Sequence, residues 1–149
     1  MKYLASFKWN VRRAAAFVVL LFGFAMCAYA AQTAVTPQSP LGPYPGTVSA
    51  GQLALTFASS DNVNGNSFPC TGHEILLVDN TDAASQTVTI SSVADQFGRT
   101  QDITAYSMAA GTFAVFNFRG GCTGWKQTDG TVHISTSTAT VKVAVIQVQ

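Results

Sequence analysis

Short apolar runs separated by turn-forming residues dominate the chain from Val48 onward. Runs rich in Val, Ile, Thr and Phe alternate with clusters of Gly, Asn, Asp and Ser, and this pattern is typical of strands joined by turns. Helical periodicity is missing from this part of the sequence. We expect strands within residues 53–57, 74–78, 87–91, 103–108, 112–118, 132–134 and 141–148.

The spacing of these runs predicts an all-β fold. Strands recur about every 8–14 residues, which favours an antiparallel β-sandwich of about seven or eight strands, immunoglobulin-like or jelly-roll-like. No helix-length amphipathic segment separates the runs, which argues against a parallel α/β sheet.

The order of apolar and polar residues within each run predicts which faces of its strand are buried. Residues 74–78 are nearly all apolar after Glu74, so they should form a central strand buried on both faces. Val88 and Ile90 should share one buried face, and residues 103–108 and 112–118 should alternate in the same way. Residues 141–148 are apolar on both faces, which leaves two interpretations: a central strand, or an edge strand covered by another subunit.

The first thirty residues differ from the rest. Residues 1–13 are positively charged, residues 14–30 are uncharged and apolar, and the segment ends Cys27-Ala28-Tyr29-Ala30, which fits a signal peptide cleaved after Ala30. The alternatives are an uncleaved hydrophobic helix that anchors the chain in a membrane and a wrongly extended gene start. Membrane contact is expected only through residues 1–30, and only if they are uncleaved.

A proline-rich arm or linker is predicted over residues 31–47, ahead of a β-sandwich domain over residues 48–149. Four of the five prolines lie in this arm, and proline favours extended backbone. The arm is either a spacer or a segment that docks on a neighbouring subunit. In the second case Pro43 and Tyr44 are candidate interface residues.

Charge argues against a nucleic-acid partner. Residues 31–149 hold four basic and seven acidic residues, a net charge of −3. Phosphate neutralisation needs clustered Lys and Arg, and this part of the chain has no such cluster.

Two cysteines remain after the N-terminal segment. Cys70 and Cys122 are each followed by Thr-Gly, and an even count in an oxidising compartment favours a disulfide. The alternative is two unpaired thiols that face the core.

Metal and catalytic motifs are weak. Cys70, His73, Cys122 and His133 offer zinc-ligand chemistry, but their spacing matches no compact zinc site. The Asn-rich residues 61–66 lack the acidic ligands of a calcium loop. Glu74 and Asp102 could serve as a pair of catalytic carboxylates, but nothing in the sequence places them near each other. The common catalytic motifs are absent. We therefore expect a protein without cofactor or enzymatic activity.

Loop aromatic and basic residues are the better candidates for function. Trp125 follows Gly124 in a predicted loop, with Arg119 and Lys126 beside it. Aromatic and Arg side chains are enriched where proteins bind proteins. We expect Trp125, Arg119 and Lys126 to lie at an interface.

A pattern of strand and turn residues extends from Ala31 to Val148. It consists of residues 64–68, 71–80, 87–90, 98–99, 110–111, 124–125, 130 and 141–145, together with Asp102. This pattern resembles small β-sandwich capsid decoration and accessory head proteins of tailed bacteriophages. The resemblance implies a structural protein of the virion that binds capsid subunits or copies of itself. Residues 1–30 instead favour an exported periplasmic or cell-surface binding module, such as an adhesin or a filament subunit. These two functions predict different locations, the virion in one case and the secreted or periplasmic space in the other.

Overall fold

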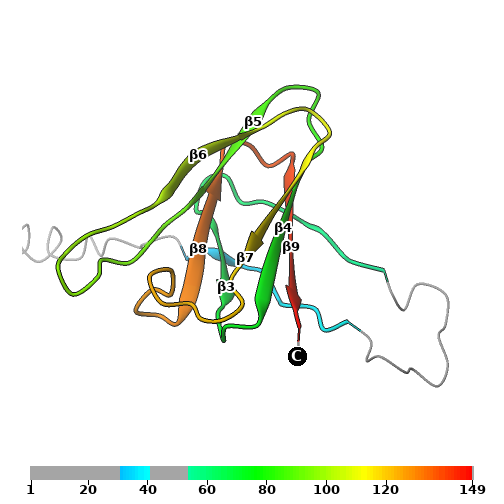
Figure 1. Ribbon diagram of the computed structural model, residues 1–149. Helices are drawn as coiled ribbons and strands as arrows, with labels where there is room; N and C mark the ends of the chain where they lie inside the picture. Colours follow the sequence, from blue (N-terminus) through cyan, green and yellow to red (C-terminus); the bar gives the residue numbers. More distant parts are fainter. Residues whose placement is uncertain (1–30, 41–53, 149) are drawn as a thin grey trace, which may run out of the picture. The chain divides into compact units, whose positions relative to one another are not determined.

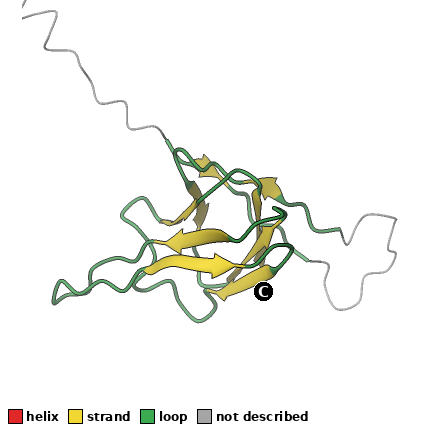
Figure 2. Cartoon of the chain, turned by 90° about the horizontal axis from the view of Figure 1, so that it is seen from above, coloured by secondary structure: helices red, strands yellow, loops and turns green. Residues whose placement is uncertain are grey.

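The computed structural model describes residues 31–40 and 54–148. Pro43 and Tyr44 of the predicted arm, and the predicted hydrophobic helix within residues 1–30, lie outside these ranges. All regular structure in the described ranges is β (Figures 1 and 2). None of it is a helix that could cross a membrane.

Two sheets build a β-sandwich-like fold, which confirms the predicted all-β class. One sheet has the order β1-β3-β8-β5-β6 and the other has the order β2-β9-β4-β7. All strand pairs are antiparallel except β1 with β3. The strands are β1 Thr33–Ala34, β2 Ala58–Ser59, β3 Asn66–Pro69, β4 Glu74–Asn80, β5 Gln86–Ile90, β6 Ile103–Met108, β7 Phe113–Asn117, β8 Thr131–Thr136 and β9 Val141–Gln147.

The core lies between the two sheets, where alternate side chains of both meet. Phe68, Val88, Ile90, Val132 and Ile134 come from the five-stranded sheet and are at most 1% exposed. The four-stranded sheet contributes buried Leu76, Val78, Val141, Val143 and Val145. Burial of this apolar surface is the main source of stability, at about 25 cal/mol per Å².

The strand predicted over residues 141–148 is central, because β9 lies between β2 and β4. The strand predicted over residues 74–78 is also central, but only one of its faces is fully buried. Along β4 the side chains alternate between buried and half-buried. The described residues cover the outer face of this sheet only in part: Ala144 is fully buried there and the Phe57 ring lies near the Phe113 ring, but Val115 is 62% exposed. The prediction that both faces are buried was wrong.

Two other expectations need correction. Residues 54–57 are not a strand; the Gln38 side chain holds Thr56 instead, donating to its carbonyl at 2.6 Å and accepting from its N–H at 2.9 Å. In β6 the predicted alternation is broken by a register shift against β5. Ala105 there has φ 47°, and Met108 is the one buried side chain of the strand.

The described start of the predicted arm packs on its own sandwich. Thr33 and Ala34 pair with β3, Val35 is buried, and Gln38 forms a bridge to Ile146 of β9. Residues 33–38 therefore contact one edge of each sheet.

Candidate functional site

Three loops meet at one end of the sandwich, where β3, β5, β7 and β9 end and β4, β6 and β8 begin. We call this the disulfide end; it consists of residues 70–73, 91–102 and 118–130. Backbone hydrogen bonds join the loops, from Gly120 N–H to Gly72 O at 3.0 Å and from Val93 N–H to Gly124 O at 2.6 Å. The loops thus form one continuous surface.

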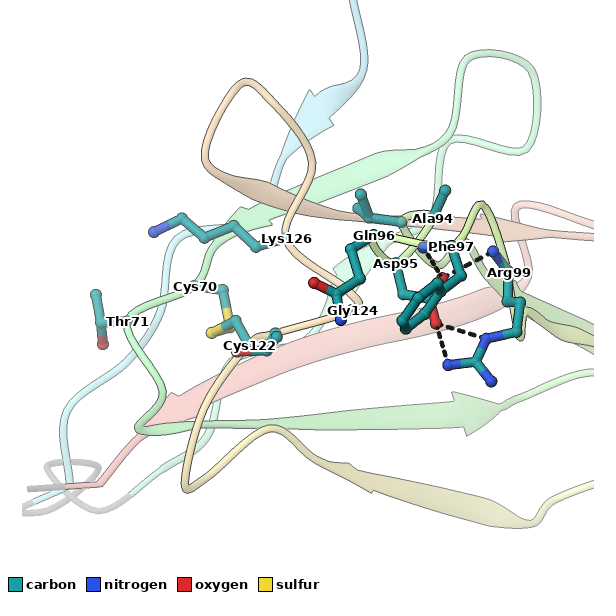
Figure 3. Close-up of a pocket in the computed structure, with 12 residues that line it drawn as sticks. Cys70, Thr71, Ala94, Asp95, Gln96, Phe97, Arg99, Cys122, Gly124 and Lys126 are labelled. Carbon is teal, nitrogen blue, oxygen red and sulfur yellow. Dashed lines mark hydrogen bonds and ion pairs between the residues drawn. A yellow bond between two sulfur atoms is a disulfide. The ribbon is translucent and has the colours of Figure 1, made fainter.

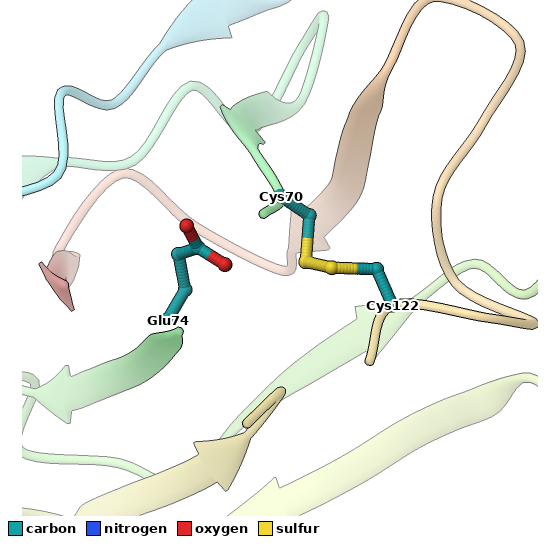
Figure 4. A group of neighbouring side chains, drawn as sticks. All are labelled: Cys70, Glu74 and Cys122. Carbon is teal, nitrogen blue, oxygen red and sulfur yellow. A yellow bond between two sulfur atoms is a disulfide. The ribbon is translucent and has the colours of Figure 1, made fainter. Parts of the chain in front are cut away.

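A disulfide fixes the centre of this surface. Cys70 and Cys122 are bonded, with a Cα–Cα distance of 6.1 Å, as predicted, and both are buried. Cys70 follows β3 in one sheet, and Cys122 lies in the loop that leaves β7 of the other. The bond therefore holds the 118–130 loop against the end of the opposite sheet (Figure 4).

Beside the disulfide, the buried carboxylate of Glu74 organises residues 71–73. It accepts hydrogen bonds from the N–H groups of Thr71 at 2.8 Å, Gly72 at 2.9 Å and His73 at 3.1 Å, and from Thr71 Oγ1 at 2.6 Å. Burial raises the pKa of Glu74, but these hydrogen bonds outweigh that effect and hold the pKa below its usual value. Gly72 has φ +92°, a conformation that glycine adopts readily and that turns its N–H toward the carboxylate.

Residues 91–102 form the outer wall of the disulfide end. Between this wall and the disulfide lies an open hollow of about 870 Å³, lined in part by Asp95, Phe97, Arg99 and Lys126 (Figure 3). Arg99 is paired with Asp95 at 2.6 Å and lies over the Phe97 ring, 5.2 Å from its centroid. The Arg99 side chain hydrogen bond lowers the pKa of Asp95. Phe97 remains 72% exposed and is available to a partner.

Arg119 and Lys126 are exposed at the disulfide end, as an interface role requires. Neither forms an ion pair with any residue in the described ranges. Together with Arg99 they are three of the four basic residues in residues 31–149. The fourth, Lys142, lies in β9 near the opposite end. Three of the four basic residues therefore lie at the disulfide end, and two of these have no acidic partner among the described residues.

Trp125 is half-buried rather than exposed. Its ring packs edge-on against Phe118, with centroids 6.1 Å apart, and Phe118 packs in turn against Phe68 at 5.4 Å. Trp125 thus connects the 118–130 loop to the core. A change at Trp125 would disturb the loop as well as any partner contact, so Arg119 and Lys126 test the interface more cleanly.

Apart from His73, the residues weighed for metal binding and catalysis have other partners. The sulfur atoms of Cys70 and Cys122 are bonded to each other, and Nε2 of His133 lies 2.9 Å from Asp129. That contact is the main cause of the low pKa of Asp129, about 2. Asp102 accepts hydrogen bonds from Ser92 Oγ and N–H, whereas Glu74 is bound to residues 71–73.

Asp61, in the Asn-rich loop, accepts hydrogen bonds from Val63 N–H, Asn64 N–H and the Asn64 and Thr33 side chains. These bonds, led by the one from the Asn64 backbone, lower its pKa to about 2. These hydrogen bonds explain why the Asn-rich residues 61–66 form a turn.

The fold and site define a β-sandwich-like protein with a disulfide-braced loop surface. No protein-family model, curated protein or solved structure matches the chain.

Proposed function

We propose that the protein is a non-enzymatic structural component of a bacteriophage virion that decorates the capsid and binds capsid subunits through its disulfide end. The sandwich is proposed to be immunoglobulin-like or jelly-roll-like. The observation that carries the proposal is the braced loop surface that presents Phe97, Arg119 and Lys126. The resemblance of residues 31–148 to capsid decoration and accessory head proteins points to the same role.

The rigidity of this surface favours binding. Loops already held by a disulfide, by Glu74 and by inter-loop hydrogen bonds lose little conformational entropy when they dock. The exposed Phe97 ring supplies apolar area. Arg119 and Lys126, which have no acidic partner among the described residues, are available to carboxylates on the capsid.

The double substitution Arg119→Ala/Lys126→Ala tests this proposal. We expect capsid affinity to fall by roughly tenfold or more, since truncation of a central interface residue commonly costs more than about 1 kcal/mol. Occupancy on purified capsids, measured over a range of salt concentrations, reports the loss. Lys142→Ala removes a basic residue outside the disulfide end and is the matched control. Equal occupancy for the double variant and the control would contradict the proposed binding surface.

The alternative is an exported periplasmic or cell-surface binding module, such as an adhesin or filament subunit. The Cys70–Cys122 disulfide favours it, because such bonds persist in oxidising compartments, and so does the apolar segment ahead of Ala31.

N-terminal sequencing separates the two functions. Export predicts a chain that begins at Ala31 and is recovered from the periplasm or culture supernatant. The virion role predicts co-purification with capsids. A chain that keeps Met1 and sediments with capsids would eliminate the export alternative.

A further inference from the structure

The outer edge of β7 differs from the other sheet edges. At the far side of its sheet, β2 has only two residues. In the five-stranded sheet, β1 also has two residues and β6 carries the register shift and the positive φ of Ala105. Short strands and bulges are devices that keep an edge from pairing with another chain. By contrast, β7 is a regular five-residue strand, Phe-Ala-Val-Phe-Asn, without proline, bulge or charge.

The backbone of β7 has hydrogen-bonding groups directed away from its sheet. Asn80 N–H donates to Thr112 O and Phe118 N–H donates to Glu74 O, both at 3.0 Å. In an antiparallel pair such bonds alternate, so the even-numbered residues of β7 pair with β4. The N–H and C=O groups of Phe113, Val115 and Asn117 therefore point to the free edge, where no described strand pairs with them.

The side chains beside this edge are apolar and accessible. Phe113 is 63% exposed and Val115 is 62% exposed on the outer face of the sheet. Leu77 of β4 lies opposite Val115, with Ala144 of β9 beyond it. Ala144 is fully buried, and the Phe57 ring lies 6.2 Å from the Phe113 ring. The exposed apolar area beside the free edge is therefore supplied by Phe113 and Val115 of β7, with half-buried Leu77 next to them.

We propose that β7 pairs antiparallel with β7 of a second copy of the chain, so that the two four-stranded sheets become continuous across a two-fold axis. This inference goes beyond the proposed capsid binding and uses a different surface. The pairing is backbone-mediated strand addition, and a two-fold axis at Ala114 sets Phe113 of each copy opposite Val115 of the other. Both are odd-numbered residues, so both have backbone groups free for the pairing.

Charge favours a copy of the chain as the occupant. Residues close to the two-fold axis lie near their own counterparts, so a charge beside Ala114 would be repelled by the same charge of the other copy. No residue of β7 is charged. The nearest carboxylate on this face is Asp79, opposite Phe113. Its counterpart would lie three strand spacings away, roughly 14 Å, which exceeds the screening length of about 8 Å at physiological salt.

Sedimentation velocity across a wide range of protein concentration tests the proposal on the chain as purified. We expect a reversible dimer, weak because the edge is short. Val115→Lys should raise its dissociation constant by roughly tenfold or more, since a charge on an edge opposes pairing. Val115→Pro should do the same, because it removes an outward N–H and leaves the bonds to β4 intact. Val63→Lys changes an apolar residue that is 83% exposed in another loop and should leave the dimer unchanged. A thermal melt of each variant checks that it is folded.

Amide hydrogen exchange gives the structural readout. The N–H groups of Phe113 and Val115 should become more protected as concentration rises, whereas those of Ala114 and Phe116 should be protected throughout. A chain that stays monomeric, or a dimer that neither Val115 variant weakens, would overturn the proposal. A monomer whose capsid occupancy falls with Val115→Lys would assign the edge to a capsid segment and also overturn it.

Discussion

Loss of the Cys70–Cys122 disulfide is expected to lower the free energy of unfolding by about 4 kcal/mol. The bond joins residues 52 positions apart, and in the chain-entropy model a closed loop of this length restricts the unfolded chain strongly. The double substitution Cys70→Ser/Cys122→Ser, compared with the parent chain by urea denaturation, measures the change. The melting temperature should fall as well.

Reduction of the parent protein is the complementary measurement. A reductant should shift the parent toward the double variant and leave the variant unchanged, which separates the bond from the effect of two buried hydroxyl groups. An unfolding transition that reductant does not move would show that the bond contributes no stability.

Glu74→Gln is expected to lower the free energy of unfolding by about 2–3 kcal/mol. The N–H groups of Thr71, Gly72 and His73 all donate to Oε2, and Thr71 Oγ1 donates to Oε1. An amide with its oxygen at the Oε2 position keeps the three N–H partners but loses the negative charge that strengthens their bonds, and its NH₂ group removes the acceptor of Thr71 Oγ1. Hydrogen bonds to a charged group contribute about 1.5–3 kcal/mol, against about 0.5–1.5 kcal/mol for neutral ones. Residues 71–73 should also exchange their amide hydrogens faster. Asp79→Asn is the control, because it removes a carboxylate charge from the outer face of the same strand.

The pH dependence of stability provides a second test of Glu74. Its pKa is lower in the folded protein than the ordinary value of 4.5, so the unfolded chain binds the proton more readily. The stabilisation is fully present above pH 4.5 and is lost as the pH falls through the folded pKa. The difference in stability between the parent and Glu74→Gln should therefore shrink on acidification. Because other carboxylates with lowered pKa titrate in both proteins, this difference isolates Glu74.

Hydrophobic alternation predicted much of the sandwich. Val88 and Ile90 are buried on one face of β5 as expected, and the long apolar run at Val141 forms a central strand. Alternation failed at residues 54–57, where the side chain of Gln38 takes the place of a neighbouring strand. It also failed at Ala105, because a register shift depends on how two strands pair and leaves little trace in either one.

The candidate site was predictable only in part. The even count of cysteines indicated the disulfide, and Arg119 and Lys126 were identified from their place in a loop. The sequence placed Glu74 at the head of an apolar strand but did not predict which groups would donate hydrogen bonds to its carboxylate. Phe97 was missed, since an exposed aromatic in a turn has the same local pattern as a buried one. The free edge of β7 could not be predicted from the sequence, because it depends on the order of the strands in the sheet.

The disulfide reinforces the end of the sandwich where the chain itself connects the sheets less often. At the opposite end, the loops that cross between the two sheets include residues 81–85, 109–112 and 137–140, whereas at the disulfide end the loops that cross are residues 70–73 and 118–130. The Cys70–Cys122 bond gives this end a further covalent connection. A reducing environment should therefore loosen the surface proposed to hold the capsid before it affects the far end.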